Sequence, residues 1–168
     1  WLGAETIGVA VAILNLLWVP VVAFAGIALP DMILTIPIIA AFLVSFLHFV
    51  TLYRLRVGIS RKQTFGAVLA AMSVQWTVAR AVGDGIIKEH LPFARTAKGG
   101  RARRPRNFQA FWETIVGTAL LLGAAILIVT NRMQVHEVTV FAAVLVIQSL
   151  PFLSAAAIAF IEGKRFND

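Results

Sequence analysis

The sequence contains no cysteine, which excludes a disulfide framework and any metal site built on thiolates. Histidine is scarce, and His48, His90 and His136 lie in three separate segments without the spacing of metal ligands. The acidic residues number eight, against 15 Lys and Arg, and they are spread singly along the chain. Because no two carboxylates are placed to suggest a pair for acid–base catalysis, we expect no catalytic residue and no metal or other cofactor in this chain.

Charged residues make up only 14% of the chain, whereas a soluble domain has roughly a quarter. The hydrophobic fraction is 60%, and it is concentrated in long runs, which indicates membrane-spanning helices. The net charge of +7 would suggest nucleic acid in a soluble protein. In a membrane protein the same excess marks loops that stay on the cytoplasmic side and face anionic lipid. We therefore expect a lipid bilayer including anionic lipid as a partner, and no nucleic acid.

Four runs carry no Asp, Glu, Lys or Arg: residues 6–30, 32–53, 114–131 and 138–161. Each is long enough for the roughly 17–25 residues that a helix needs to cross the hydrocarbon core. Short connections join the first run to the second and the third to the fourth, so each pair is expected to return antiparallel. The predicted parts are a first transmembrane hairpin at 1–53 and a second hairpin with a short tail at 110–168.

The segment at 63–88 is ambiguous, because its uncharged stretch is only just long enough for a span. Its apolar residues, from Phe65 to Ile87, recur with the 3.6-residue period of an amphipathic helix. If the segment lies along the interface, 14 of the 15 basic residues share one side, and only Arg132 is opposite. If it crosses, Arg80 enters the bilayer at a cost of about 2.5–3.5 kcal/mol. The positive-inside bias favours an interfacial helix.

The predicted fold is therefore an all-α integral membrane protein with four transmembrane helices in two hairpins. A cytoplasmic loop and the amphipathic interfacial helix occupy 54–90, and a basic loop occupies 91–109. All basic loops but one are expected on the cytoplasmic side of a multi-pass protein.

The basic loop contains residues that suit a nucleoside diphosphate. The ring of Phe93 can stack on a base, worth roughly 1–3 kcal/mol. The Thr96 hydroxyl and the Lys98 ammonium can reach phosphate oxygens, and Arg95 adds a bidentate donor. Two glycines follow directly and allow the loop to change shape. The alternative is an ordinary juxtamembrane loop without a ligand.

The run Phe93-Ala94-Arg95-Thr96-Ala97-Lys98 resembles the Phe-x-Val-Thr-x-Lys gating loop of cellulose synthase-like, family-2 processive glycosyltransferases. In that family the loop also lies between an amphipathic interfacial helix and a terminal pair of spans. The Leu91-Pro92 lead-in is similar to the bacterial β-glucan synthase branch. By this resemblance Phe93 would stack near the uracil of a UDP-sugar, while Thr96 and Lys98 would contact the nucleotide and its phosphates. Arg95 replaces the family's Val.

The resemblance implies a β-glycosyltransferase of the bacterial inner membrane that elongates a glucan from a UDP-sugar, with UDP-glucose as the expected donor. The enzyme would pass the growing glucan through a channel of its own helices. The Asp-x-Asp, Thr-Glu-Asp and Gln-x-x-Arg-Trp motifs of the family's catalytic half do not occur here. A glycosyltransferase domain upstream of Trp1, on the same polypeptide, is therefore expected to supply them together with Mg²⁺ or Mn²⁺.

Polar residues at membrane depth often face the interior of a bundle or a pore. In a glucan channel their side chains would hydrogen-bond sugar hydroxyls beside aromatic stacking surfaces. Interhelical hydrogen bonds and lipid-facing aromatic rings are the alternative. Two further alternatives are a membrane subunit of a transporter, whose halves usually match as these hairpins do not, and a lipid-binding scaffold without catalytic role. The candidate channel residues are Asn15, Trp18, Phe42, Phe46, His48 and Gln148.

Overall fold

In the computed structural model the chain is described at residues 2–25, 32–88, 108, 110–131 and 135–165. These residues form helices and turns, and none of them is in a β-strand. The helices are α1 (Leu2–Ala25), α2 (Met32–Leu55), α3 (Arg61–Ser73), α4 (Gln75–Ile87), α5 (Phe111–Thr130) and α6 (His136–Arg165). The all-α prediction is confirmed for this part of the chain.

Four of the described helical stretches are long and apolar enough to cross a membrane: Glu5–Ala25, Arg61–Ile87, Phe111–Thr130 and His136–Gly163. Within α2, the stretch Phe42–Leu55 is a shorter apolar helix. Large apolar side chains point outward from these helices, including Phe24 and Val129, which are more than three-quarters exposed. Outward apolar faces on long helices are compatible with a multi-pass membrane protein.

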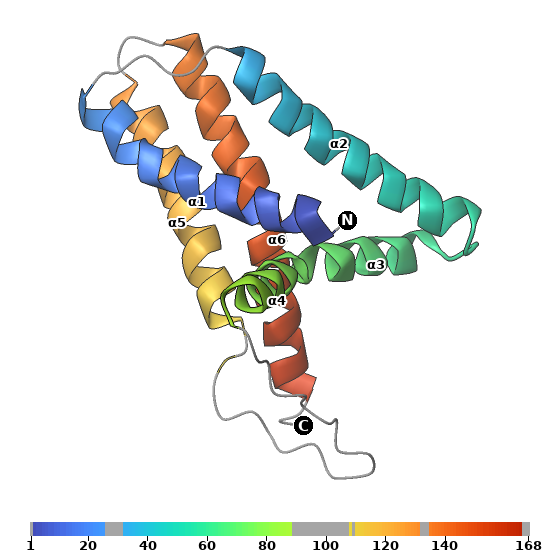
Figure 1. Ribbon diagram of the computed structural model, residues 1–168. Helices are drawn as coiled ribbons and strands as arrows, with labels where there is room; N and C mark the ends of the chain where they lie inside the picture. Colours follow the sequence, from blue (N-terminus) through green and yellow to red (C-terminus); the bar gives the residue numbers. More distant parts are fainter. Residues whose placement is uncertain (1, 26–31, 89–107, 109, 132–134, 166–168) are drawn as a thin grey trace.

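Helices α5 and α6 lie side by side as an antiparallel pair, as predicted for 110–168 (Figure 1). Gly117 of α5 allows this close approach to α6, and Gly123 of α5 allows a close approach to α1. A Cβ built on Gly117 would lie 3.1 Å from Phe152 Cβ, and one on Gly123 would lie 3.1 Å from Val19 Cγ2 of α1. Small residues at such crossings are typical of helix packing in membranes. The centre of the pair is fully buried, with Leu120 and Leu145 at 0% exposure.

The two helices of the predicted first hairpin, α1 and α2, pack mainly on other helices. Within the described residues, α1 packs mainly on α4 and α5, while α2 packs on α3 and α6. Val9, Ala12 and Val19 of α1 belong to the buried core that α5 and α6 share. The space between α1 and α2 is a cavity, so a short connection in sequence does not make these two helices neighbours.

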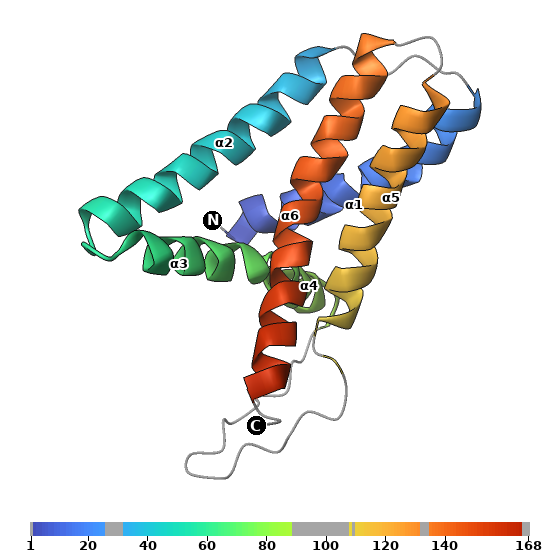
Figure 2. The ribbon, with the colours of Figure 1, turned by 180° about the vertical axis from the view of Figure 1, so that it is seen from behind.

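The predicted amphipathic helix at 63–88 is two helices of 13 residues rather than one. The break lies at Val74, whose N–H bonds to Met72 O, and the Ser73 hydroxyl donates to Ala70 O at 2.8 Å. Such local bonds compete with the regular helical ladder. Helices α3 and α4 run across α5 and α6 instead of along them (Figures 1 and 2). Together the two helices form one of the four stretches that are long and apolar enough to cross a membrane, so their position along an interface stays a prediction.

The basic helix ends lie on the same half of the bundle. The C-terminal end of α2, both crosswise helices, the start of α5 and the end of α6 lie on this half (Figures 1 and 2). The end of α1, the start of α2, the end of α5 and the start of α6 lie on the other. The described basic side chains on this half of the bundle are all exposed: Arg54, Arg56, Arg61, Lys62, Arg80 and Lys88.

Candidate functional site

A cavity of about 460 Å³ lies between α1, α2, α3, α4 and α6, and we call it the central cavity. Its size falls within the roughly 300–1,000 Å³ of sites that bind small molecules. Five helices contribute, so the cavity depends on the tertiary arrangement and not on one segment. It is lined by Glu5, Ile7, Gly8, Val11, Ala12, Phe42, Phe46, Phe49, Val68, Ala71, Met72, Gln75, Ile147, Gln148, Pro151 and Phe152.

Helix α2 supplies an aromatic wall to the central cavity. Phe42, Phe46 and Phe49 are spaced i, i+4 and i+7, which places them on one face of the helix. The rings of Phe42 and Phe46 are stacked, with centroids 6.3 Å apart and planes 16° from parallel. A further ring, that of Phe152, comes from α6 and meets Trp76 of α4 edge-on at 6.2 Å. The α2 wall presents flat apolar surface to whatever occupies the cavity.

An amide pair joins α1 to α6 at the cavity. Asn15 Nδ2 donates to Gln148 Oε1 at 3.0 Å, across 133 positions of sequence. This bond uses the Gln148 oxygen and leaves its NH₂ group able to donate twice. One helical turn further, Pro151 lacks an N–H and cannot serve the carbonyl of Ile147. Ile147, Gln148 and Pro151 all line the cavity, and the Gln148 amide is the side-chain donor on this stretch of α6.

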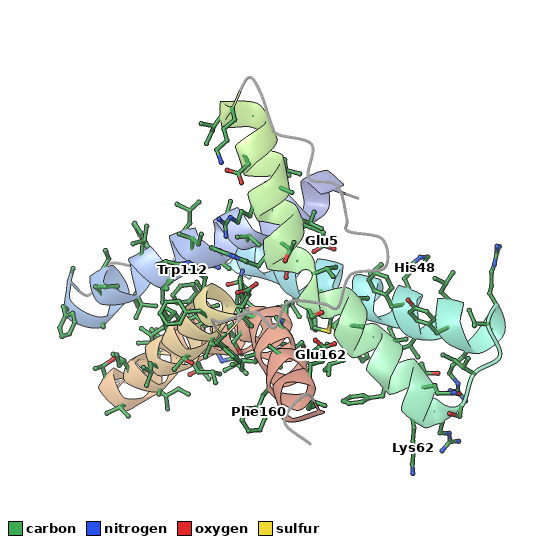
Figure 3. All side chains as sticks on the ribbon, turned by 90° about the horizontal axis from the view of Figure 1, so that it is seen from below. Glu5, His48, Lys62, Trp112, Phe160 and Glu162 are labelled. Atoms are coloured by element: carbon green, nitrogen blue, oxygen red, sulfur yellow. The ribbon has the colours of Figure 1, made fainter. Side chains whose placement is uncertain are left out.

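Two further polar groups line the cavity, Gln75 at the start of α4 and Glu5 on α1. The Gln75 amide lies over Gly8, because a Cβ at that glycine would come within 2.6 Å of Gln75 Nε2. The glycine therefore leaves the room that the amide occupies. Viewed from below, Glu5 lies near the junction of α3 and α4, whereas His48 lies on the outer side of α2 (Figure 3).

The structure brings four of the six candidate channel residues together. Phe42, Phe46 and Gln148 line the central cavity, and Asn15 is bonded to Gln148. The other two do not line it. Trp18 is 39% exposed on α1, and His48 is exposed, with its ring edge-on to that of Phe49 at 6.2 Å. The predicted nucleotide-binding residues Phe93, Arg95, Thr96 and Lys98 lie outside the described residues.

Sequence reasoning missed 13 of the 16 lining residues. Four of the 13 are aromatic or polar, and their sequence signals differ. Phe49 completes the stripe that begins with Phe42 and Phe46, so helical spacing was sufficient to find it. Phe152 is an apolar residue in an apolar run, and Gln75 follows a helix break that the sequence did not reveal. Glu5 stands at the edge of the first uncharged run, where nothing local in the sequence links it to another polar group. Only the contacts between helices assign these three to the cavity.

The lining of the central cavity combines apolar surface with a few polar groups. It offers aromatic faces, amide groups and one carboxylate. In the part of the chain that the structure describes, no three His, Cys, Asp or Glu side chains are grouped to hold a metal ion. Comparisons of the chain with protein-family models, with curated proteins and with solved structures found no match.

Proposed function

We propose that this chain is the membrane channel and gating-loop part of a β-glycosyltransferase of the bacterial inner membrane. The enzyme elongates a glucan from a UDP-sugar, with UDP-glucose as the donor, and translocates the product across the membrane. The observation that carries the proposal is the central cavity, where the α2 aromatic wall lies near the Asn15–Gln148 amide pair. A sugar ring has apolar faces that stack on aromatic rings and hydroxyls that bond to amides.

The basic loop supplies the contacts to the donor nucleotide in this proposal, through Phe93, Arg95, Thr96 and Lys98. The basic half of the bundle faces the cytoplasm by the positive-inside bias, so the loop and a cytoplasmic UDP-sugar share one side. A glycosyltransferase domain of the same polypeptide performs the transfer, with Mg²⁺ or Mn²⁺ bound there. The residues of this chain bind the nucleotide and guide the polymer.

A lipid-binding membrane protein without catalytic role is the second candidate. It is supported by the composition of the cavity wall, where Glu5, Gln75 and Gln148 are the only polar side chains among the lining residues. A mostly apolar wall also suits a hydrocarbon chain, because the burial of apolar surface is favourable and does not depend on the direction of contacts. The two candidates differ in whether the polar groups of α6 contact the occupant.

The test of the channel uses the full-length protein in membranes and incorporation of glucose from labelled UDP-glucose into polymer. Gln148→Ala removes an amide from the cavity, and the loss of a hydrogen bond, roughly 0.5–1.5 kcal/mol, predicts a roughly two- to tenfold drop in polymer yield. Phe46→Ala should lower the yield as well. Trp18→Ala and His48→Ala alter side chains outside the cavity and serve as matched controls that keep full yield.

The loop is tested separately by the affinity for UDP. Phe93→Ala removes base stacking of roughly 1–3 kcal/mol and should weaken UDP binding at least about fivefold, and Lys98→Ala should weaken it too. The cavity variants should leave UDP affinity unchanged. Unchanged nucleotide affinity and polymer yield in both loop variants would remove the gating loop from the proposal. Failure to make any polymer from UDP-sugars would favour the lipid-binding alternative.

A further inference from the structure

The corner between α2 and α3 carries four cations, Arg54, Arg56, Arg61 and Lys62, and we call it the basic corner. All four side chains are exposed. The sequence contains no Asp or Glu from residue 32 to residue 83. In the described part of the chain the ion pairs join Arg80 and Lys88 to Asp84, and none involves the basic corner. The four positive charges therefore repel each other, and no carboxylate in the described part of the chain neutralises them.

The basic corner has a defined shape. Gly58 adopts a left-handed conformation with φ of 62°, which glycine accepts at low steric cost. Ser60 then caps α3 in a reciprocal capping box, in which Ser60 N–H donates to Gln63 Oε1 at 3.1 Å and its own hydroxyl accepts from Gln63 N–H at 3.4 Å. The turn thus joins the end of α2, with Arg54 and Arg56, directly to the start of α3, with Arg61 and Lys62.

The position of Arg61 and Lys62 at the start of α3 makes the binding of an anion there more favourable. They are the first two residues of α3, where the helix dipole is positive and acidic residues are preferred. The dipole and the cations disfavour one another at this position unless a negative group approaches. An anion at the corner would therefore interact favourably with the four side chains and with the start of the helix.

Exposed apolar side chains alternate with the cations. Leu55 is 80% exposed, Val57 is 56% exposed and Phe65, on the first part of α3, is 69% exposed. A soluble polyanion offers nothing to these groups, whereas a bilayer surface offers phosphates to cations and acyl chains to apolar residues. Helix α3 also runs across α6, which is the course expected of a helix lying in the interface (Figure 1). Together these features point to lipid.

We propose that the basic corner is a binding site for the phosphate headgroup of an anionic phospholipid. Arg54, Arg56, Arg61 and Lys62 contact the headgroup, and Leu55, Val57 and Phe65 enter the adjoining acyl region. The site is independent of the central cavity and of any activity on glucans. It would fix the depth of α3 in the interface and the position of the α2 end.

The test compares two double variants of the full chain, purified in a mild zwitterionic detergent. Arg61→Gln/Lys62→Gln removes two cations from the basic corner, while Arg80→Gln/Lys88→Gln removes two that are paired with Asp84. Both change the net charge equally. Native mass spectrometry measures the affinity for phosphatidylglycerol and for phosphatidylcholine. Since each cation near a membrane surface is worth roughly a fivefold factor, the first variant should bind phosphatidylglycerol about 25-fold more weakly.

The control variant should keep its preference for phosphatidylglycerol within about twofold, and Arg61→Lys should retain binding because it keeps the charge. Helix content by circular dichroism checks that each variant is folded. Equal losses in both double variants would mean attraction to net charge only, and would overturn the site. So would unchanged binding in Arg61→Gln/Lys62→Gln. If inorganic phosphate at matched concentration displaces the lipid and stabilises the protein equally, the ligand is a free anion and not a lipid.

Discussion

Replacing Gly117 by alanine tests whether α5 and α6 pack as closely as the structure describes. The new Cβ would lie 3.1 Å from Phe152 Cβ, 3.1 Å from Leu153 Cδ2 and 3.2 Å from Leu153 Cγ. The Leu153 side chain can turn away. Phe152 Cβ is attached directly to the backbone of α6, and this side chain is buried in the core. Relief of that contact therefore requires α6 to move by a few tenths of an ångström.

The size of the effect follows from two opposing contributions. Alanine is favoured over glycine inside a helix by about 0.8–1.0 kcal/mol. Inserting a methyl group into a well-packed core disfavours the fold by about 1–3 kcal/mol. Gly117→Ala should therefore lower the free energy of unfolding by up to about 2 kcal/mol. Gly66→Ala provides the matched control, because it lies inside α3 with nothing within 4 Å of its Cβ position, and it should raise stability by up to about 1 kcal/mol.

The assay is unfolding of the purified chain in mixed micelles by titration with sodium dodecyl sulfate, followed by circular dichroism. The difference between the two variants isolates the packing contribution, since the helix-propensity gain is common to both. We expect Gly117→Ala to unfold at the lower detergent fraction, and Gly117→Leu to unfold lower still. If Gly117→Ala is stabilised as much as Gly66→Ala, the close approach of α5 and α6 is not present in the protein.

Three further predictions use the same assay. Asn15→Ala, Gln148→Ala and the double variant should show a coupling free energy of about 0.6 kcal/mol, with an upper limit of about 1.7, as for other interhelical bonds in membranes; strict additivity would show that the bond is absent. Ser60→Ala should lower stability by about 0.5–2 kcal/mol through loss of the α3 cap, and Ser60→Asp should restore it. Trp76→Leu should lower the free energy of unfolding by about 0.5–1.5 kcal/mol more than the loss of buried apolar area accounts for, because the edge contact with Phe152 is removed. Trp76→Phe should retain most of this contribution.

The lengths of the helices could be predicted because uncharged runs and charged ends are local features. The predicted span at 114–131 corresponds to Phe111–Thr130, and the one at 32–53 corresponds to Met32–Leu55. What the runs could not predict is which helices touch. The first two predicted spans are adjacent in sequence, yet α1 packs on α4 and α5. Which helices touch depends on how their surfaces fit together, for example where Gly123 of α5 leaves room for Val19 of α1. The length of a hydrophobic run gives no information on this fit.

The candidate site was predictable to the extent that it lies on one helix face. Spacing groups Phe42 with Phe46 on α2, and it extends to Phe49 without further information. Polarity at membrane depth singled out Asn15 and Gln148, but nothing local pairs residues 133 positions apart. His48 had the same polarity and is exposed on the outer face of its helix. Periodicity defines a face, and only the tertiary arrangement decides what that face meets.

The walls of the central cavity differ in chemistry, and this difference separates its two proposed occupants. The polar groups lie on α1, α4 and α6, which are tied together by the Asn15–Gln148 bond and the contact of Trp76 with Phe152. The aromatic wall lies on α2. A sugar ring uses both kinds of wall, whereas a hydrocarbon chain leaves amide donors without a partner, which disfavours it by about 1–3 kcal/mol.

Gln148→Leu keeps the volume of the side chain approximately and removes its hydrogen bonds. If glucan occupies the cavity, this variant should lower polymer yield about as much as Gln148→Ala does, because both lose the same bonds. If lipid occupies it, Gln148→Leu should retain more co-purifying lipid than the unchanged protein, because apolar surface replaces an amide. The outcome is measured by lipid extraction beside the polymer assay. Equal lipid content together with undiminished polymer yield would show that Gln148 faces neither occupant, and that the cavity is only a gap in packing.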